Sequence, residues 1–312
     1  MARQRKRKGD PVHGWLGLDK PVDMTSTQCV GALKRLLNAQ KVGHGGTLDP
    51  LADGILPIAF GEATKTVQWA MDGEKEYVFT IEWGKSTATQ DREGEVIATS
   101  EARPAREAVE TALAAFVGDI EQVPPKYSAI KVDGERAYDL AREGEDFELE
   151  KRPVTVHEAS VTDASDADHV TIHVVTGKGF YVRALARDLA SDLDTEGHIV
   201  KLRRTRVGPF DEANAVSLAD IEAMEDASAR RAALDPIETP LSDTPALDIG
   251  PDGAAQLRQG RTIVLLPHLV EQWRAEAADP ENRIALAMDG DTAVALGEVR
   301  AGRFQPTRVF QL

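Results

Sequence analysis

The chain has 312 residues, of which 42% are hydrophobic and 29% charged, and its formal net charge at pH 7 is −15. No stretch approaches the roughly 18 uncharged apolar residues of a membrane span, so we expect no membrane association, and the length allows one large domain plus a smaller one. The single cysteine, Cys29, excludes an intramolecular disulfide framework, and the first residues lack the apolar stretch of a signal peptide, so a cytoplasmic protein is expected.

The chain begins with a basic segment, residues 1–10, which is expected to be a flexible arm. Ser26 can then cap a helix over residues 26–38, because Leu33 and Leu37 recur at helical spacing on one face. This helix leads into the most informative segment of the chain.

That segment is a glycine-rich loop, residues 43–54, which carries Asp49 between two apolar segments. Backbone angles closed to other residues are open to its early glycines, Gly43, Gly45 and Gly46. Pro50 biases Asp49 toward an extended conformation and so fixes its direction. The pattern indicates a carboxylate that is held in one direction with space in front of it.

Several motifs that resemble this loop fail on the residues present. A phosphate-binding loop would need glycine before Lys65, where Thr64 stands. A calcium loop starting at Asp49 would need an oxygen ligand at Leu51, and a dinucleotide fingerprint would need glycine at Leu48. Two interpretations remain open from the residues alone, namely a working carboxylate and a tight turn with a capping aspartate.

Regular elements follow the loop. Residues 54–60 are predicted to form a buried strand, and residues 63–71 a short helix with Val67 and Met71 directed inward. Residues 104–117 are predicted to form a helix, because proline stands at the start of this segment and Gly118 follows its end. Between these helices a half-buried strand is predicted from alternating apolar residues, Tyr77, Phe79, Ile81 and Trp83.

Residues 124–153 differ from their surroundings, because eight acidic residues lie between positions 133 and 150, and they are interpreted as an insertion. Strands are predicted at residues 154–161 and 170–175, followed by a helix over residues 181–190. This mixture indicates an α+β fold with helices flanking a sheet.

The last hundred residues are predicted to contain a connecting segment followed by a small β-rich domain. Residues 211–244 are rich in alanine and acidic residues and are predicted to be a helical connection. Residues 245–312 are predicted to be β-rich, with a hairpin of residues 283–288 and 292–299 and a closing strand over residues 304–312.

Net charge argues against a nucleic-acid partner unless the charge is unevenly placed. Residues 211–312 hold 18 acidic and 9 basic residues, against 34 and 28 in residues 1–210. Basic clusters occur at residues 3–8, 34–41 and 201–206. Each cluster is either a solvated surface or, if they converge near Asp49, part of a site for an RNA backbone.

Five blocks of sequence, in order, resemble the TruB family of tRNA pseudouridine synthases. One block joins the Asp49 loop, which resembles the family signature G-H-x-G-x-L-D-P-x-A-x-G, to Gly61–Lys65, which resembles the G-x-A-T-K element that follows it. The other four blocks are residues 18–26, 122–131, 179–183 and 202–205. The chain departs from the family pattern at Asp23, Gly45, Ala88, Thr176, Gly177 and Phe180.

The resemblance implies isomerisation of a uridine, in which the bond to N1 is broken, the uracil turns, and C5 joins the same ribose carbon. It makes Asp49 the catalytic residue, and no cofactor or metal is expected. An aspartate is normally ionised at neutral pH and can act as nucleophile or base. Attack on the base, attack on the sugar and removal of a sugar proton all stay open.

The resemblance also implies the substrate-binding residues. Tyr77 stacks on the flipped base, although its place in an apolar row also suits a core tyrosine. Tyr181 lines the uracil pocket and Arg183 pairs with Asp49; if the chain is extended there, the two face one side together. His44 contacts the RNA loop or bonds backbone. Second-tier candidates are Lys20, as support for the loop, and Leu202, as an apolar wall.

At the level of the whole chain, the resemblance implies a catalytic domain over residues 11–210, built on a mixed, largely antiparallel sheet. Residues 124–153 would close over the RNA, and residues 245–312 would form a PUA-like domain. The expected partner is the T-arm stem-loop of tRNA, modified at position 55 by a monomer without guide RNA. Two alternatives are an RNA-binding protein without catalysis and a guide-RNA-dependent synthase.

Overall fold

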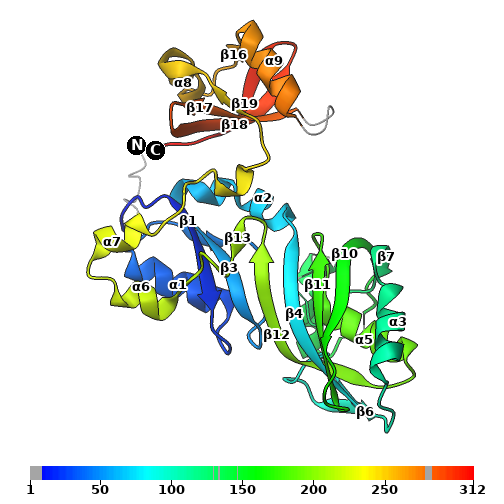
Figure 1. Cartoon of the computed structure of the whole chain (residues 1–312). Coiled ribbons are helices and arrows are strands. Elements are labelled where there is room, and N and C mark those ends of the chain that lie inside the picture. The colour runs from blue at the N-terminus through cyan, green and yellow to red at the C-terminus, as the bar shows by residue number, and fades with distance from the viewer. Residues whose placement is uncertain (1–8, 129, 133, 146, 278–282) are drawn as a thin grey trace.

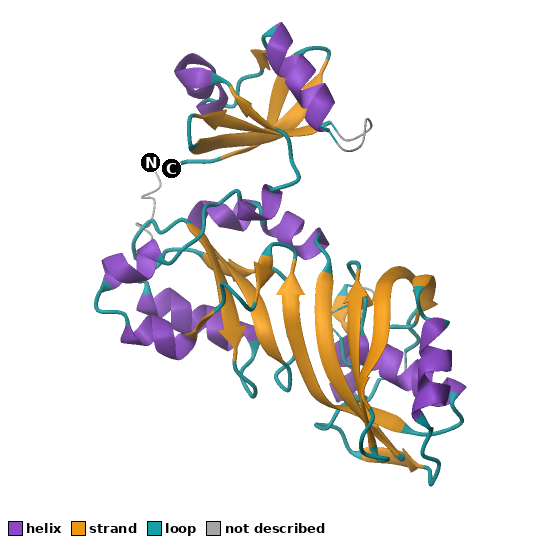
Figure 2. Ribbon diagram, in the orientation of Figure 1, coloured by secondary structure: helices purple, strands orange, loops and turns teal. Residues whose placement is uncertain are grey.

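The computed structural model describes residues 9–128, 130–132, 134–145, 147–277 and 283–312. It contains a large mixed sheet flanked by helices and a smaller five-stranded sheet near the C-terminus (Figures 1 and 2). The basic cluster at residues 3–8 lies outside the described residues. Within the described part of the chain, no helix is both long and apolar enough to cross a membrane.

The large sheet has the strand order β14-β1-β3-β12-β4-β11-β10-β7, with β2 paired to β3 and β13 paired to β12. All its neighbours are antiparallel except β1 with β14 and β3 with β12. The mixed, largely antiparallel sheet is therefore confirmed. Its strands are β1 (Gly14–Lys20), β2 (Val42–His44), β3 (Asp53–Phe60), β4 (Lys75–Trp83), β7 (Gly118–Gln122), β10 (Arg152–Asp163), β11 (His169–Thr176), β12 (Gly197–Val207), β13 (Phe210–Asp211) and β14 (Val216–Ser217).

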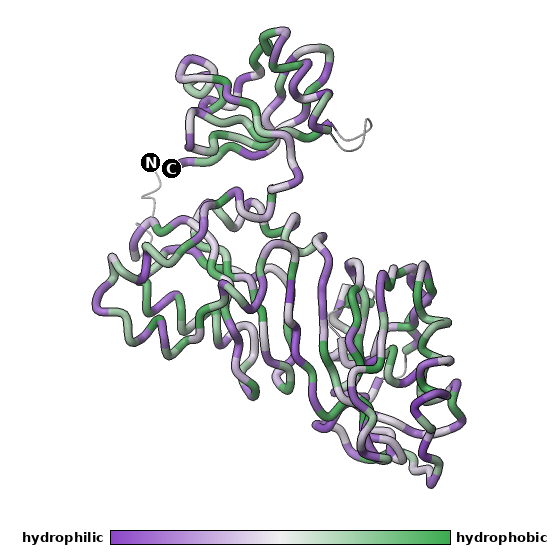
Figure 3. The backbone as a smooth tube through the Cα atoms, in the orientation of Figure 1, coloured by the Kyte–Doolittle hydropathy of each residue, from purple (hydrophilic) through white to green (hydrophobic). Residues whose placement is uncertain are grey.

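Strand β4 shows why this sheet forms. Its residues alternate between buried and half-buried from Lys75 to Trp83, as the apolar alternation predicts. Phe79 and Ile81 are fully buried, in one apolar core with Leu185 and Leu189 of helix α5 (Val182–Asp192). Figure 3 shows that hydrophobic and hydrophilic positions are interspersed along the strands. The buried row fixes the register of β4 between β11 and β12.

Helices flank the sheet at several places. Helix α5 packs near β12 and β4, α3 near β10, and α1 near β2 and α6 (Figure 1). The helices are α1 (Ser26–Leu36), α2 (Val67–Asp72), α3 (Arg106–Ala114), α4 (Ala137–Glu143), α5 (Val182–Asp192), α6 (Leu218–Ala223), α7 (Ala227–Ala232), α8 (Gly250–Arg258) and α9 (Pro267–Glu276), with 3₁₀ turns η1 (Gly61–Lys65) and η2 (Thr239–Leu241).

The first helix is capped differently from the prediction. Thr25, not Ser26, is the N-cap of α1, and it forms a capping box with Gln28. The Ser26 hydroxyl is buried and instead exchanges two hydrogen bonds with the backbone of Leu48. The residue predicted to start a helix therefore also holds the loop that carries Asp49.

Two other predictions were wrong in detail. The helix predicted over residues 63–71 is split into η1 and α2, and Met71 is 42% exposed rather than directed inward. Tyr181 is extended, but it is the N-cap of α5, so Arg183 lies in the first helical turn. The two residues therefore do not share one side of an extended segment.

The acidic insertion leaves the sheet after β7 and returns at β10, which are neighbouring strands. Its described residues form the small hairpin β8 (Lys131–Val132) and β9 (Glu135–Arg136), followed by α4. A second hairpin, β5 (Lys85–Thr87) with β6 (Val96–Thr99), extends from the end of β4.

The C-terminal sheet has the order β15-β17-β18-β19-β16 and includes the predicted hairpin. It shares an apolar cluster with the large sheet, in which Leu296 and Phe310 lie with Trp15 and Ile55. Residues 211–244 are not purely helical, because β14 joins the large sheet. The strands of the small sheet are β15 (Ala246–Asp248), β16 (Ile263–Val264), β17 (Ile284–Asp289), β18 (Thr292–Arg300) and β19 (Arg303–Val309).

Candidate active site

The Asp49 loop connects β2 to β3 and is fixed from two sides. On one side, the fully buried Lys20 donates hydrogen bonds from Nζ to the carbonyls of Pro21, Met24 and Pro50, at 2.8, 2.7 and 3.4 Å. The backbone N–H of Asp23 also donates to the Pro50 carbonyl, at 2.8 Å. Lys20 lines neither of the cavities at Asp49, so its position suits the support of the loop rather than contact with a substrate.

On the other side, the loop is held by Arg204 of β12, which is only 3% exposed. Its guanidinium donates from Nε to the Ile55 carbonyl at 2.8 Å and from its two other nitrogens to Thr47 and Gly46, at 3.3 and 3.2 Å. Strands β3 and β12 approach closely here, because a Cβ on Gly54 would lie 2.2 Å from the Arg204 carbonyl oxygen. The basic run at residues 201–206 thus supplies a clamp for the loop.

The glycines of the loop differ in why glycine is required at each position. Gly46 has φ of +112°, which only glycine adopts readily, whereas a Cβ on Gly43 would meet nothing within 4 Å. Gly45 lies close to Ala70, at 3.1 Å from a built Cβ. The sequence argument for unusual backbone angles therefore holds for Gly46 and not for Gly43.

The carboxylate of Asp49 forms an ion pair with Arg183, at 2.9 Å, as the resemblance predicts. The Arg183 side chain is 7% exposed and also lies 3.4 Å from the carboxylate of Asp91, which is 3% exposed. Arg183 also donates hydrogen bonds to the carbonyls of Thr89 and Tyr127, both at 2.9 Å. A buried guanidinium with several acceptors therefore holds Asp49, whose side chain stays 36% exposed.

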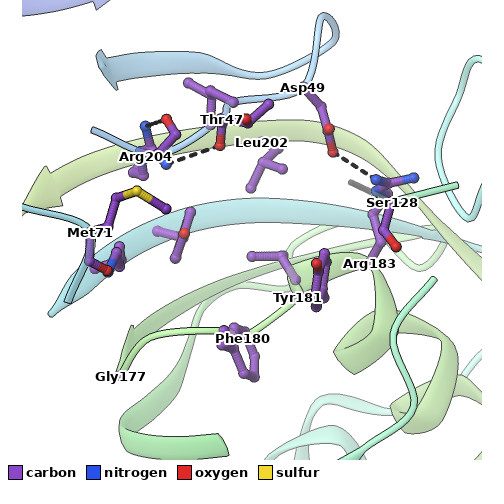
Figure 4. A pocket seen from close by; sticks show the side chains of 16 residues that line it. Thr47, Asp49, Met71, Ser128, Gly177, Phe180, Tyr181, Arg183, Leu202 and Arg204 are labelled. Atoms are coloured by element: carbon purple, nitrogen blue, oxygen red, sulfur yellow. Dashed lines mark hydrogen bonds and ion pairs between the residues drawn. The ribbon is translucent and has the colours of Figure 1, made fainter. Parts of the chain in front are cut away.

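A cavity of about 290 Å³ opens beside this pair (Figure 4). Its floor is formed by side chains on one face of β4 and β12, among them the buried Tyr77 and Leu202. Tyr181 borders it from the start of α5, where the Gln122 side chain bonds both the N–H and the carbonyl of Tyr181. Burial raises the pKa of the Tyr181 phenol. The cavity therefore joins an apolar floor to a charged edge.

A second cavity, of about 610 Å³, meets the first at Asp49. His44 lines this cavity and not the first one, and burial lowers the pKa of its imidazole, with the Arg204 charge as a second cause. Its Nδ1 is buried without a partner among the described residues. The insertion contributes Lys131 and Arg142 to the same cavity. The site residues Asp49, Tyr77, Tyr181, Arg183 and Leu202 thus share the first cavity, with His44 in the adjoining one.

The basic run at residues 201–206 is partly ion-paired. Arg203 is paired with Asp19 and Glu212, and Arg206 with Glu76. The charges of these two arginines are therefore matched locally, and a contact of the cluster with an RNA backbone stays a prediction.

Sequence reasoning missed Arg204 and Asp91 as individual residues of the site, and also Lys75, which lines the first cavity. Within the described residues, no three His, Cys, Asp or Glu side chains gather as a metal site would require. What the arrangement offers is one partly exposed carboxylate, aimed by a buried arginine, at the edge of a cavity with an aromatic floor.

Replacing Arg204 with methionine should lower the free energy of unfolding by about 2–3 kcal/mol, because three carbonyls of the loop region lose their donor. The matched control is Arg206→Met on the same strand, whose partly exposed ion pair with Glu76 should contribute less than about 1 kcal/mol. Denaturant unfolding measures both values. Equal losses in the two variants would contradict the role of Arg204 as a clamp.

Two family models match this chain. The family described as "TruB family pseudouridylate synthase (N terminal domain)" matches residues 34–182, and "tRNA pseudouridylate synthase B C-terminal domain" matches residues 183–242. The border between the two matches lies at the start of α5, so both contribute to the large sheet.

Curated relatives match over almost the whole chain. A protein of Caulobacter vibrioides named tRNA pseudouridine synthase B is 57% identical over 308 residues, covering 99% of each chain. A protein of the same name from Bradyrhizobium diazoefficiens is 50% identical, over 99% of this chain and 89% of its own length.

Solved structures share the fold. One described as "Crystal Structure of a Cbf5-Nop10-Gar1 Complex" is 25% identical with a TM-score of 0.70, covering 96% of this chain and 85% of its own. Another, an H/ACA RNP bound to a substrate RNA, is 22% identical with a TM-score of 0.69, covering 100% and 92%. From the family matches and the full-length relatives, the chain belongs to the TruB family of pseudouridylate synthases.

Proposed function

We propose that this chain isomerises uridine to pseudouridine at position 55, in the T-arm loop of tRNA, with Asp49 as the catalytic residue. The observation that carries the proposal is the Asp49–Arg183 ion pair of 2.9 Å at the edge of a cavity floored by Tyr77. The family and the name of the curated relatives supply the reaction and the class of RNA.

The geometry suits a base that is taken out of its stack. A uridine inside a folded loop must be turned out before a side chain can reach its sugar, and extruded bases are commonly stacked on aromatic rings. Tyr77 and Leu202 supply an aromatic and an apolar surface in a cavity of about 290 Å³, near the small end of ligand pockets. With the base on this floor, Asp49 at the edge faces the sugar side.

The chemistry needs few groups. The N1–C1′ bond breaks with its electron pair on the base, C5 forms the new bond to C1′, C5 loses its proton, and N1 gains one. Arg183 keeps the Asp49 carboxylate aimed during these steps, because the pair is held by a nearly buried guanidinium. Activity without a cofactor or guide RNA is part of the proposal.

The rest of the RNA loop would occupy the second cavity, which meets the first at Asp49. His44 lies there, and Lys131 and Arg142 bring positive charge from the insertion. In this arrangement the insertion residues that line this cavity, such as Lys131 and Arg142, contact the bound loop. Recognition then depends on the shape of a single-stranded loop more than on its sequence.

The proposal is tested by incubating the purified chain with an unmodified tRNA transcript and with its isolated T-arm stem-loop, followed by chemical mapping of pseudouridine. Conversion at position 55 is expected in both RNAs, and none in a matched transcript with cytidine there. Conversion at another position would contradict the assignment of the target. Tight binding without conversion would indicate an RNA-binding protein or one that needs a guide.

A further inference from the structure

Lys75 is a buried cation that the proposed reaction has not yet used. It is the first residue of β4, it is 7% exposed, and it lines the same cavity as Asp49 and Tyr77. Because side chains alternate along a strand, Lys75 and Tyr77 share one face, about 6.7 Å apart along the backbone. A stacked base on Tyr77 would therefore have the Lys75 side chain next to its edge.

The ammonium of Lys75 has two hydrogen-bond acceptors in the structure. Nζ donates to the carbonyls of Met71 and Gly73, at the end of α2. An ammonium has three N–H donors, and the described residues supply no third acceptor and no carboxylate within ion-pair distance. One donor is thus available to a molecule in the cavity.

Holding this charge in place is unfavourable for the fold. Burial, followed by the neighbouring Arg204 charge, lowers the pKa of Lys75 to about 8, and Lys178 acts in the same direction while Asp72 opposes it. A buried cation without a full set of partners usually lowers stability. Because Lys75 lines the proposed substrate cavity, a bound substrate can supply the missing acceptor.

The two ends of the cavity are chemically different. Figure 4 shows Asp49 and Arg183 at one end and Met71 and Arg204 at the other. Lys75 belongs to the second end, because its Nζ bonds the Met71 carbonyl. Arg204 is also at that end, but each of its three nitrogens already donates to a backbone carbonyl of the loop region, so the guanidinium is fixed against the loop. Lys75 is the second cation at that end of the cavity.

The shape of uracil determines which atom reaches this end. The carbonyl at C4 lies directly across the ring from N1, so O4 points away from the sugar when N1 carries the ribose. After isomerisation C5 carries the ribose, and the carbonyl directly across the ring is then C2. A donor opposite Asp49 therefore faces a carbonyl oxygen in both the substrate and the product.

We propose that Lys75 recognises the target base by donating a hydrogen bond to O4 of uridine, and to O2 once the ring has turned. The inference rests on the proposed function. It has two consequences: the detached base, which carries the electron pair of the broken N1–C1′ bond, is stabilised by a cation, and cytosine is rejected because its 4-amino group is a donor.

The test combines a protein change with a change of one substrate atom. Wild type and Lys75→Met are assayed in single turnover on T-arm stem-loops that carry uridine, 4-thiouridine or 2-thiouridine at the target position. Sulfur accepts hydrogen bonds more weakly than oxygen. The matched control is Lys178→Met, which removes an equally charged, exposed residue that does not line the cavity.

We expect Lys75→Met to slow uridine conversion about 10- to 100-fold and Lys178→Met to leave it nearly unchanged. In wild type, the 4-thio substitution should slow conversion more than the 2-thio substitution does. In Lys75→Met, the 4-thio substitution should slow conversion little further, because the protein variant and the substituted atom remove the same hydrogen bond. RNA affinity should change little, because the charge acts on the base.

Independent, multiplicative effects of Lys75→Met and 4-thiouridine in an active enzyme would overturn the inference and leave the proposed function intact. Weaker RNA binding with a smaller salt dependence would assign Lys75 to a phosphate instead, and would also overturn it. If Lys75→Met does not fold, equal rates of wild type on 4-thio and 2-thio substrates would overturn it. A wild type inactive on plain uridine would overturn both proposals.

Discussion

Asp49→Asn is expected to lower the rate of pseudouridine formation by roughly 10⁴-fold or more while the chain still binds tRNA. The amide keeps the size of the side chain and can still accept a hydrogen bond from Arg183, but it is neither a nucleophile nor a base. Single-turnover conversion of a T-arm stem-loop measures the rate, and filter binding measures the affinity.

The matched control is Asp53→Asn, at the start of β3 and near the end of the same glycine-rich segment. Asp53 has the same exposed fraction as Asp49, 36%, and its carboxylate lies 3.5 Å from Arg203. Its replacement should leave the rate within a few-fold of wild type. Retained turnover in Asp49→Asn, or loss of tRNA binding as its main effect, would contradict the assignment of Asp49.

Arg183→Met is expected to reduce turnover by about 10²- to 10³-fold and also to destabilise the fold by about 3 kcal/mol. Asp49 loses the group that aims it, and Asp91, only 3% exposed, is left without its ion pair. Thermal unfolding and single-turnover rates separate the two effects. Arg183→Lys keeps the charge but cannot reach both carboxylates and both carbonyls, so its activity should also fall strongly.

Two further variants make this prediction specific. Arg187→Met lies one turn later on α5 and removes a partly exposed arginine that bonds Asp188 and Val123, so it should have little effect on turnover. Adding Asp91→Asn to Arg183→Met should recover part of the stability and none of the activity. Recovery of activity in that double variant would show that Arg183 acts only through the fold.

Much of the fold was predictable because it depends on local patterns. The apolar alternation of residues 77–83 gave β4, and the D-G-D turn gave the hairpin of β17 and β18. The glycine-rich loop with Pro50 indicated where a working carboxylate would lie, and the resemblance named its arginine partner. All these features except the arginine partner, Arg183, depend on neighbouring residues in the sequence.

The remaining features depend on contacts between distant segments. Arg204 is adjacent to exposed or ion-paired basic residues in the sequence, and only the approach of β12 to the loop buries it. Lys75 is a lysine at the start of a strand, and nothing in the neighbouring sequence indicates that it is buried. Asp91 lies in a polar turn, where the sequence suggests an exposed side chain, although the structure buries it. Long charged side chains are assigned to the surface by default, so buried ones are missed until their acceptors are placed.

The most direct test of the account is a structure of the Asp49→Asn chain bound to a T-arm stem-loop with its target uridine. We predict that the base lies in the cavity, stacked on Tyr77, with C1′ of its sugar next to residue 49 and O4 next to Lys75. A target uridine that stays stacked in the RNA loop, or that enters a different part of the chain, would contradict the account.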